Sequence, residues 1–145
     1  MKILLDPQIF NQQTYGGISR YYTEVFSIIS KKKNVEIVLP LYQSDNAYLK
    51  NTDLLIDNKP LNFFYNILSA LRISTRSLRK KKSDQLLNKI FEENSYDLFV
   101  PTYYHPYFLD KIHGKPFVLT VYDMIHELMP QYFENDPYNV VEFKS

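Results

Sequence analysis

The chain has 145 residues, of which 45% are hydrophobic and 23% are charged, and its formal net charge is +1. This composition excludes a disordered chain, and the charge gives no general reason to expect nucleic acid as a partner. The lack of cysteine excludes disulfides and thiolate metal sites, and no run approaches the roughly 18 apolar residues of a membrane-spanning helix.

The first third of the chain predicts a β-α-β unit. The segment KILLD, residues 2–6, is typical of a short buried strand that Pro7 ends. A glycine pair follows, and then the stretch GISRYYTEVFSIISKKK, with apolar residues at helical spacing and lysines in its last turn. The β-branched segment VEIVLPLY, residues 35–42, predicts a second strand. A helix between two such strands indicates that the strands are parallel.

The rest of the chain predicts further helices and strands in alternation. A polar loop over residues 43–60, with LLID as an optional strand, precedes a helix over 61–82 and a helix over 83–94 that Ser83 or Asp84 caps. A strand over 96–104 follows and stops near Pro101. After a turn at Gly114 come a strand over 115–123 and a short helix or turn that Pro130 limits. This alternation predicts an α/β fold, in which helices flank a Rossmann-like parallel sheet within one domain.

Ligands of such sheets bind where the strands end at their carboxyl side. Three segments of this chain should meet there. They are the loop after Asp6, the loop after Pro101 and the turn at Asp123. We therefore expect the functional residues in these three segments.

The glycine pair, Gly16 and Gly17, has two interpretations. Two glycines before a helix let the backbone approach a phosphate at the helix N-terminus. Alternatively, the turn simply requires positive φ. The pair belongs neither to a G-x-G-x-x-G fingerprint nor to a P-loop.

The stretch TVYDMIHE, residues 120–127, holds an Asp-x-x-His pair at the end of a predicted strand. One helical turn would place Asp123 and His126 on the same face, as an acid/base or orienting pair. Alternatively, Asp123 caps the following turn and His126 binds backbone. A metal site is less expected, because further ligands would have to come from His105 or His113 in separate loops.

Two further features carry open alternatives. The segment YYHPYF, with Tyr103, Tyr104 and His105, either lines a sugar or acceptor pocket or is a rigid loop whose rings pack inward. A basic run follows an apolar, aromatic stretch and suits a helix on anionic lipid, although a solvated helix end is the simpler interpretation and RNA binding a weaker one. The run consists of Arg72, Arg76, Arg79, Lys80, Lys81 and Lys82.

Together, the stretches KILLD…GGISRYYTEV, YDLFVPTYY and FVLTVYDMIHELMPQYF resemble the N-terminal domain of retaining family 4 glycosyltransferases with the GT-B fold. The resemblance covers nearly the whole chain in order, and GGISRY and TVYDMIHE are its most specific parts. It implies two Rossmann-like domains that face each other across a cleft. Such enzymes move a sugar from a nucleotide-diphosphate donor to a glycan or glycolipid acceptor, without an essential metal or other cofactor, in polysaccharide and lipopolysaccharide synthesis.

The resemblance also implies roles for individual residues. Gly16 and Gly17, with Arg20 in the same GGISRY stretch, would contact the donor phosphates or sugar. The domain would hold the acceptor, for which the loop with Tyr103, Tyr104 and His105 is the candidate from its own residues. Asp123, His126 and Tyr122 would form the catalytic group. Many relatives have T-V-H-D where this chain has TVYD, so Tyr122 stands where the family often places a histidine.

The family is more than twice as long as this chain, so the resemblance implies that the donor-binding domain and the last strand lie outside these 145 residues. We expect a fragment or a short reading frame that needs a partner for sugar transfer. The alternative is a non-catalytic binding module that forms a homodimer through its open sheet edge. We expect a cytoplasmic protein, and peripheral contact with the inner face of an anionic membrane stays an open alternative.

Overall fold

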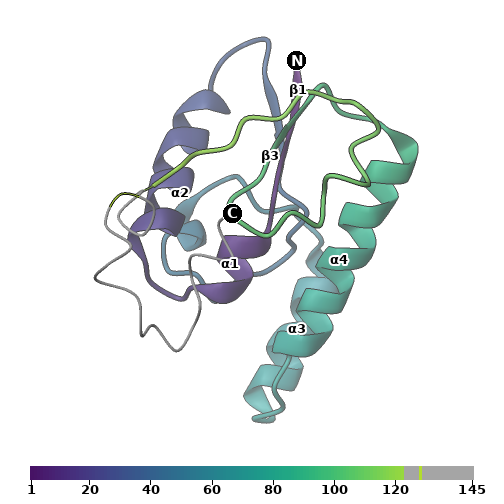
Figure 1. Cartoon of the computed structure of the whole chain (residues 1–145). Coiled ribbons are helices and arrows are strands. Elements are labelled where there is room, and N and C mark those ends of the chain that lie inside the picture. Colours follow the sequence, from purple (N-terminus) through teal and green to yellow (C-terminus); the bar gives the residue numbers. More distant parts are fainter. Residues whose placement is uncertain (123–127, 129–145) are drawn as a thin grey trace.

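The computed structural model describes residues 1–122 and residue 128. Its centre is a three-stranded parallel sheet in the order β2-β1-β3, formed by β1 (Lys2–Leu5), β2 (Glu36–Val38) and β3 (Leu98–Val100). Helices flank the sheet (Figure 1). The predicted α/β class and the parallel pairing of the first two strands are therefore confirmed, although all three strands are shorter than predicted.

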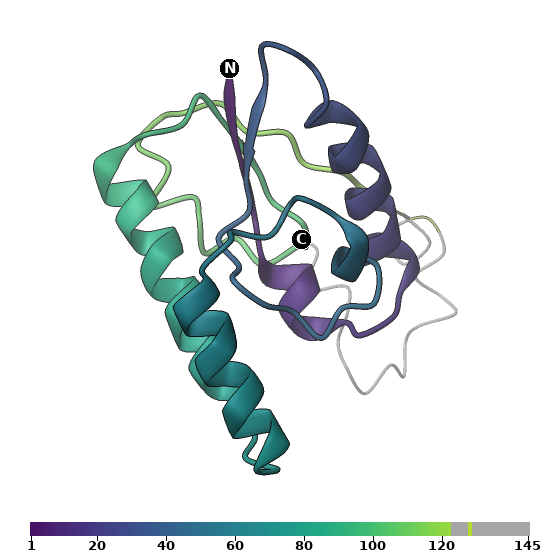
Figure 2. The same cartoon turned by 180° about the vertical axis from the view of Figure 1, so that it is seen from behind.

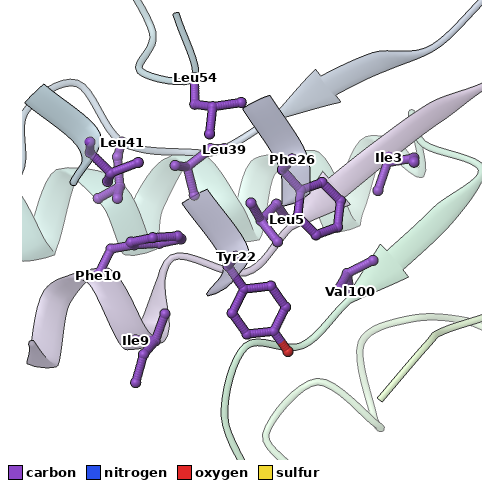
Figure 3. Close-up of a cluster of buried hydrophobic side chains, with 11 residues drawn as sticks. Ile3, Leu5, Ile9, Phe10, Tyr22, Phe26, Leu39, Leu41, Leu54 and Val100 are labelled. Carbon is purple, nitrogen blue, oxygen red and sulfur yellow. The ribbon is translucent and has the colours of Figure 1, made fainter. Parts of the chain in front are cut away.

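Strand β1 is buried on both faces. Ile3 and Leu5 point to one face and pack with Tyr22 and Phe26 of the second helix (Figure 3). Leu4 points to the other face and belongs to a second cluster, with Leu87, Ile90, Phe91, Tyr96, Phe99, Phe108 and Ile112. Successive side chains of a strand alternate between the two faces, so a continuous apolar run is needed where both faces are covered.

The first connection holds two helices, α1 (Gln8–Gln12) and α2 (Gly17–Ile29). The sequence predicted only the second of them, with the glycine pair directly after the strand. Helix α1 starts after Pro7, whose fixed φ suits a helix start, and it is anchored by the buried Ile9 and Phe10. The glycine turn therefore lies between two helices, away from the end of β1.

The next two helices, α3 (Lys59–Ala70) and α4 (Arg76–Glu93), form a hairpin that projects from the body of the protein (Figures 1 and 2). The predicted boundary at Ser83 is wrong, because Ser83 is buried inside α4. The chain turns at residues 71–75 instead, where Arg72 adopts a left-handed conformation with φ of 58°. This turn contains Ile73, Ser74 and Thr75, types that disfavour a continuing helix.

The predicted fourth strand is confirmed only in part. Phe117 forms a parallel bridge with Phe99, in which Phe99 N–H donates to Pro116 O and Val118 N–H donates to Phe99 O, both at 3.0 Å. Residues 119–122 form no strand. Gly114 makes the predicted turn with a positive φ of 77°. The predicted turn limited by Pro130 lies outside the described residues, apart from Leu128.

The loop over residues 43–58 is irregular, as predicted, except for the short 3-10 helix η1 (Leu49–Asn51). The segment LLID forms no strand. Within the described part of the chain, none of the helices combines the length and the apolar character needed to cross a membrane.

Candidate functional site

Asp6 is a fully buried carboxyl group at the end of β1. Its Oδ1 accepts hydrogen bonds from Gln8 N–H at 3.0 Å and from the Tyr107 hydroxyl at 2.6 Å, and its Oδ2 accepts one from Thr102 N–H at 3.2 Å. Burial raises the pKa of Asp6, and the hydrogen bonds offset this only in part. Burial, together with the neighbouring Asp6, also raises the pKa of Tyr107, so this phenol stays protonated at neutral pH.

Thr102 ties together the three segments that meet around Asp6. Its Oγ1 donates to the Asp6 carbonyl at 3.2 Å and accepts from Ile9 N–H at 3.1 Å. The Asp6 N–H in turn donates to Val100 O at 3.0 Å. The end of β1, the start of α1 and the end of β3 are thus held as one unit at the carboxyl edge of the sheet.

A cleft of about 690 Å³ opens at this edge, between α1, α4 and the loop after β3. Its lining is rich in amide and charged groups. From α1 and the residues before it come Asp6, Pro7, Gln8, Asn11 and Gln12, from α4 come Arg76, Lys80, Asp84, Leu87 and Asn88, and from the loop come His105, Tyr107 and Lys111. A volume of this size is typical of small-molecule sites.

Hydrogen bonds across the cleft hold its walls. The Arg76 guanidinium of α4 donates to Asn11 O of α1 at 3.1 Å, and Lys111 Nζ donates to Asn88 Oδ1 of α4 at 2.9 Å. His105 Nδ1 accepts from Tyr107 N–H at 3.2 Å, so a neutral His105 ring carries its proton on Nε2. The cleft therefore offers cations, amides and one imidazole donor, while Asp6 lies beneath Tyr107 and positions its hydroxyl.

The structure brings only part of the predicted acceptor loop to the cleft. His105 lines it, whereas Tyr103 packs against the core around β1 and α2. The Tyr104 ring contacts that of Tyr103 at a tilt of 52°, with ring centroids 5.3 Å apart. The interpretation of this loop as a rigid one with inward rings thus fits Tyr103, and the pocket interpretation fits His105.

Tyr122 lies in a cluster of tyrosines and outside the lining of the cleft. Its ring contacts those of Tyr21, Tyr22 and Tyr104 edge to face, with centroids 6.1 to 6.2 Å apart. Its N–H donates to the Tyr104 hydroxyl at 3.1 Å. Burial, followed by the adjacent Tyr22, raises the pKa of Tyr122, so the phenol stays protonated. Asp123 and His126, the other predicted catalytic residues, lie outside the described residues.

The glycine pair does not line the cleft, and the interpretation that it requires positive φ is wrong. Gly16 is extended, with φ of 173°, and a Cβ there would lie 2.0 Å from Gln13 Oε1. That oxygen accepts from Ser19 N–H in the first turn of α2, at 3.4 Å. Gly17 is the first residue of α2 and has open space around it, and Arg20 is exposed one turn later.

These surroundings predict opposite effects for alanine at the two glycines. Gly16→Ala is expected to lower the free energy of unfolding by about 1 kcal/mol, because it displaces the Gln13 amide from the start of α2. Gly17→Ala is expected to raise it by about 0.5 kcal/mol, since it restricts the unfolded chain and meets no atom. Urea unfolding followed by circular dichroism measures both.

The double variant Gln13→Ala/Gly16→Ala serves as the control for this pair. Without the Gln13 amide, the added Cβ has nothing to displace, so the two substitutions should be non-additive. If Gly16→Ala and Gly17→Ala destabilised the protein to a similar extent, the close approach between Gly16 and the Gln13 side chain would be contradicted.

The basic run is divided between different surroundings. Arg76 and Lys80 line the cleft. Arg79 forms an ion pair with Asp45, with Nη2 at 2.7 Å from Oδ2. The remaining cations, Arg72, Lys81 and Lys82, are exposed. A single role for the six residues therefore does not fit the structure.

Sequence reasoning expected functional residues in the loops after Asp6 and Pro101, but it did not single out Asp6, Thr102 or Tyr107. The available signal was a carboxylate directly after an apolar strand, in a position where a charge is rarely left without hydrogen-bond partners. Among the described residues, no group of three acidic or histidine side chains is placed to hold a metal ion. Comparisons of this chain with family models, with curated proteins and with solved structures gave no match.

Proposed function

We propose that this chain forms the acceptor-side half of a glycosyltransferase that uses a nucleotide-diphosphate sugar. The observation that carries the proposal is the polar cleft at the carboxyl edge of the parallel sheet. Its amides, at Gln8, Asn11, Gln12 and Asn88, are groups that both donate to and accept from sugar hydroxyls. The resemblance of the GGISRY and TVYDMIHE stretches to family 4 glycosyltransferases supports the same function.

The cations of the cleft specify the kind of acceptor. The lining holds three cations, Arg76, Lys80 and Lys111, and one accessible carboxylate, that of Asp84. The carboxylate of Asp6 is not accessible, because it is buried and accepts hydrogen bonds from its neighbours. A glycan or glycolipid that carries a phosphate therefore fits this lining better than a neutral glycan.

The reaction requires a second surface for the donor. The bond between the anomeric carbon and the diphosphate oxygen breaks, an acceptor oxygen bonds to that carbon, and the acceptor proton leaves to a base. The nucleoside diphosphate departs with the electron pair of the broken bond. Under this proposal Asp123 or His126 receives the proton, and Gly16, Gly17 and Arg20 face the donor.

A binding and transfer experiment tests the proposal. Saturation-transfer NMR with phosphorylated oligosaccharides should show binding to the chain, and Gln12→Ala and His105→Ala should weaken it at least about threefold, as loss of one hydrogen bond implies. Gln85→Ala, an exposed amide of α4 outside the cleft, is the matched control. Transfer from UDP-, GDP- and dTDP-sugars should appear when a family 4 donor-binding domain is added. Failure of both binding and transfer across these panels would refute the proposal.

A second candidate function is non-catalytic assembly through the sheet edge. Val118, Leu119 and Val121 are exposed apolar residues next to the bridge between Phe117 and β3. Such an edge can pair with another chain. Light scattering after size exclusion distinguishes this candidate, since it requires a dimer that Leu119→Lys dissociates.

A further inference from the structure

Helix α3 carries apolar side chains on two sides, one of which faces the protein while the other faces solvent. Tyr65 is buried and Leu61 and Leu68 are half-buried, so their side of the helix faces the protein. Asn66 Oδ1 also accepts from Gln43 Nε2 of the loop after β2, at 3.2 Å. Phe63, Ile67 and Leu71 follow one another at one-turn spacing on the opposite side, and they are 68%, 44% and 66% exposed. Surface helices normally have a polar side toward solvent, so this second, exposed apolar side is unusual.

The exposed apolar surface continues around the tip of the hairpin. Figures 1 and 2 show the α3–α4 hairpin projecting from the body, with the connecting turn at its far end. Ile73 in that turn, Leu78 in α4 and Phe64 in α3 are exposed as well. We call the six side chains the apolar tip: Phe63, Phe64, Ile67, Leu71, Ile73 and Leu78. Neighbouring apolar side chains on this scale mark an interaction surface.

The charge around the apolar tip has one sign. Residues 59–83 contain no Asp or Glu, and their cations are Lys59, Arg72, Arg76, Arg79, Lys80, Lys81 and Lys82. Arg72 lies in the turn itself, and Lys81 and Lys82 are exposed in the second turn of α4. The occupant of this surface must therefore be apolar and negatively charged.

We propose that the apolar tip docks on an anionic lipid surface, with Arg72, Lys81 and Lys82 at the level of the headgroups. A bilayer interface combines an acyl region with anionic headgroups a few ångströms away, which is the combination this hairpin matches. A second copy of the chain matches it less well, because a symmetric contact would bring two sets of cations together. The inference stands apart from the proposed sugar transfer, since neither requires the other.

Vesicle flotation of the purified chain tests the docking. The chain should float with vesicles of phosphatidylcholine and phosphatidylglycerol, should not float with phosphatidylcholine alone, and should dissociate as salt is added. Each lysine near an anionic surface contributes about fivefold to binding, so Lys81→Glu/Lys82→Glu should weaken it by at least about 25-fold. Phe63→Ser/Ile67→Ser/Leu71→Ser should abolish flotation.

Matched variants elsewhere on the chain serve as controls. Lys32→Glu/Lys33→Glu makes the same charge change on exposed residues after α2, and Ile28→Ser/Leu109→Ser removes exposed apolar side chains away from the hairpin. Both should bind vesicles as the original chain does, and circular dichroism checks that every variant is folded. The charge pair lies at exposed positions, so it tests the proposal even where the apolar triple variant fails to fold.

Three outcomes would overturn the proposal. The first is that the original chain does not float with anionic vesicles. The second is that Lys81→Glu/Lys82→Glu binds as tightly as its control pair. The third is a dimer that the apolar triple variant dissociates, without any vesicle binding, which would assign the tip to a second copy.

Discussion

The variant Asp6→Ala is expected to lose about 3 kcal/mol of unfolding free energy and to lose ligand binding in the cleft. The substitution removes the acceptor of three donors, of which the Thr102 N–H is buried and the Gln8 N–H and the Tyr107 hydroxyl are partly buried. Each buried donor left unpaired costs about 1–3 kcal/mol, and part of the sum is recovered because no carboxyl group is buried any longer. Urea unfolding at neutral pH measures the effect.

Two variants accompany Asp6→Ala. Asp6→Asn keeps the shape but places an amide N–H₂ opposite one of the donors, so it should cost about 1–2 kcal/mol. Asp110→Ala removes an exposed carboxylate from the loop that carries Tyr107 and should stay within about 0.5 kcal/mol of the original chain. If Asp6→Ala had the same unfolding free energy as Asp110→Ala, the hydrogen bonds of Asp6 would not stabilise the edge of the sheet.

Because the pKa of Asp6 is raised, the free energy of unfolding should depend on pH. Because burial lifts the pKa of Asp6 above its ordinary value of 3.8, folding favours the protonated carboxyl. This contribution is fully present below pH 3.8 and is lost as the pH rises through the pKa of the folded state. The stability of the original chain relative to Asp6→Asn should therefore fall as the pH rises from about 4 toward neutrality. A difference that grows with pH would show that the three donors outweigh burial.

The variant Phe99→Ala is expected to lose about 4 kcal/mol of unfolding free energy. Phe99 is fully buried in β3, and its ring lies 5.3 Å from that of Phe91 in α4 and 5.0 Å from that of Phe108, measured between centroids. Alanine would leave a cavity between the sheet, α4 and the loop after β3. Since α4 and this loop form two walls of the cleft, ligand binding should weaken together with stability.

Phe99→Leu is the control for this effect. Leucine keeps most of the apolar volume, so it should cost about 1–1.5 kcal/mol and leave binding in the cleft nearly unchanged. A loss below 1 kcal/mol for Phe99→Ala would mean that α4 and the loop do not depend on this contact. Urea unfolding and saturation-transfer NMR measure the two effects separately.

The parallel strands were predictable because their signals are local. The apolar run KILL reads as a strand buried on both faces, and the structure packs Leu4 on one face and Leu5 on the other. The turn at Gly114 was predictable for a similar reason, since glycine takes the positive φ found there at little cost. The α/β class and the edge at which the cleft opens follow from this order of elements.

The boundary between α3 and α4 was not predictable in the same way. Lys80, Lys81, Lys82 and Ser83 read as a helix end followed by a cap, yet all four lie inside α4. Ser83 is buried within α4, so tertiary packing outweighs its local preference for a cap. The exposure of Phe63, Ile67 and Leu71 is likewise not given by helical spacing, because α3 has apolar residues on two sides and periodicity does not show which of them is buried.

Local sequence signals are enough to predict the strands in chain order, the parallel character of the sheet and the edge where ligands are expected, because propensity and apolar spacing act over a few residues. Which side chains meet at that edge depends on tertiary packing. It buried Asp6 under Tyr107 and Thr102 from a loop about a hundred positions away, and it placed Gln13 against Gly16. It also divided the basic run between the cleft, Asp45 and the hairpin tip. These contacts join residues that are distant in sequence, so only the packing of helices on both faces of the sheet brings them together.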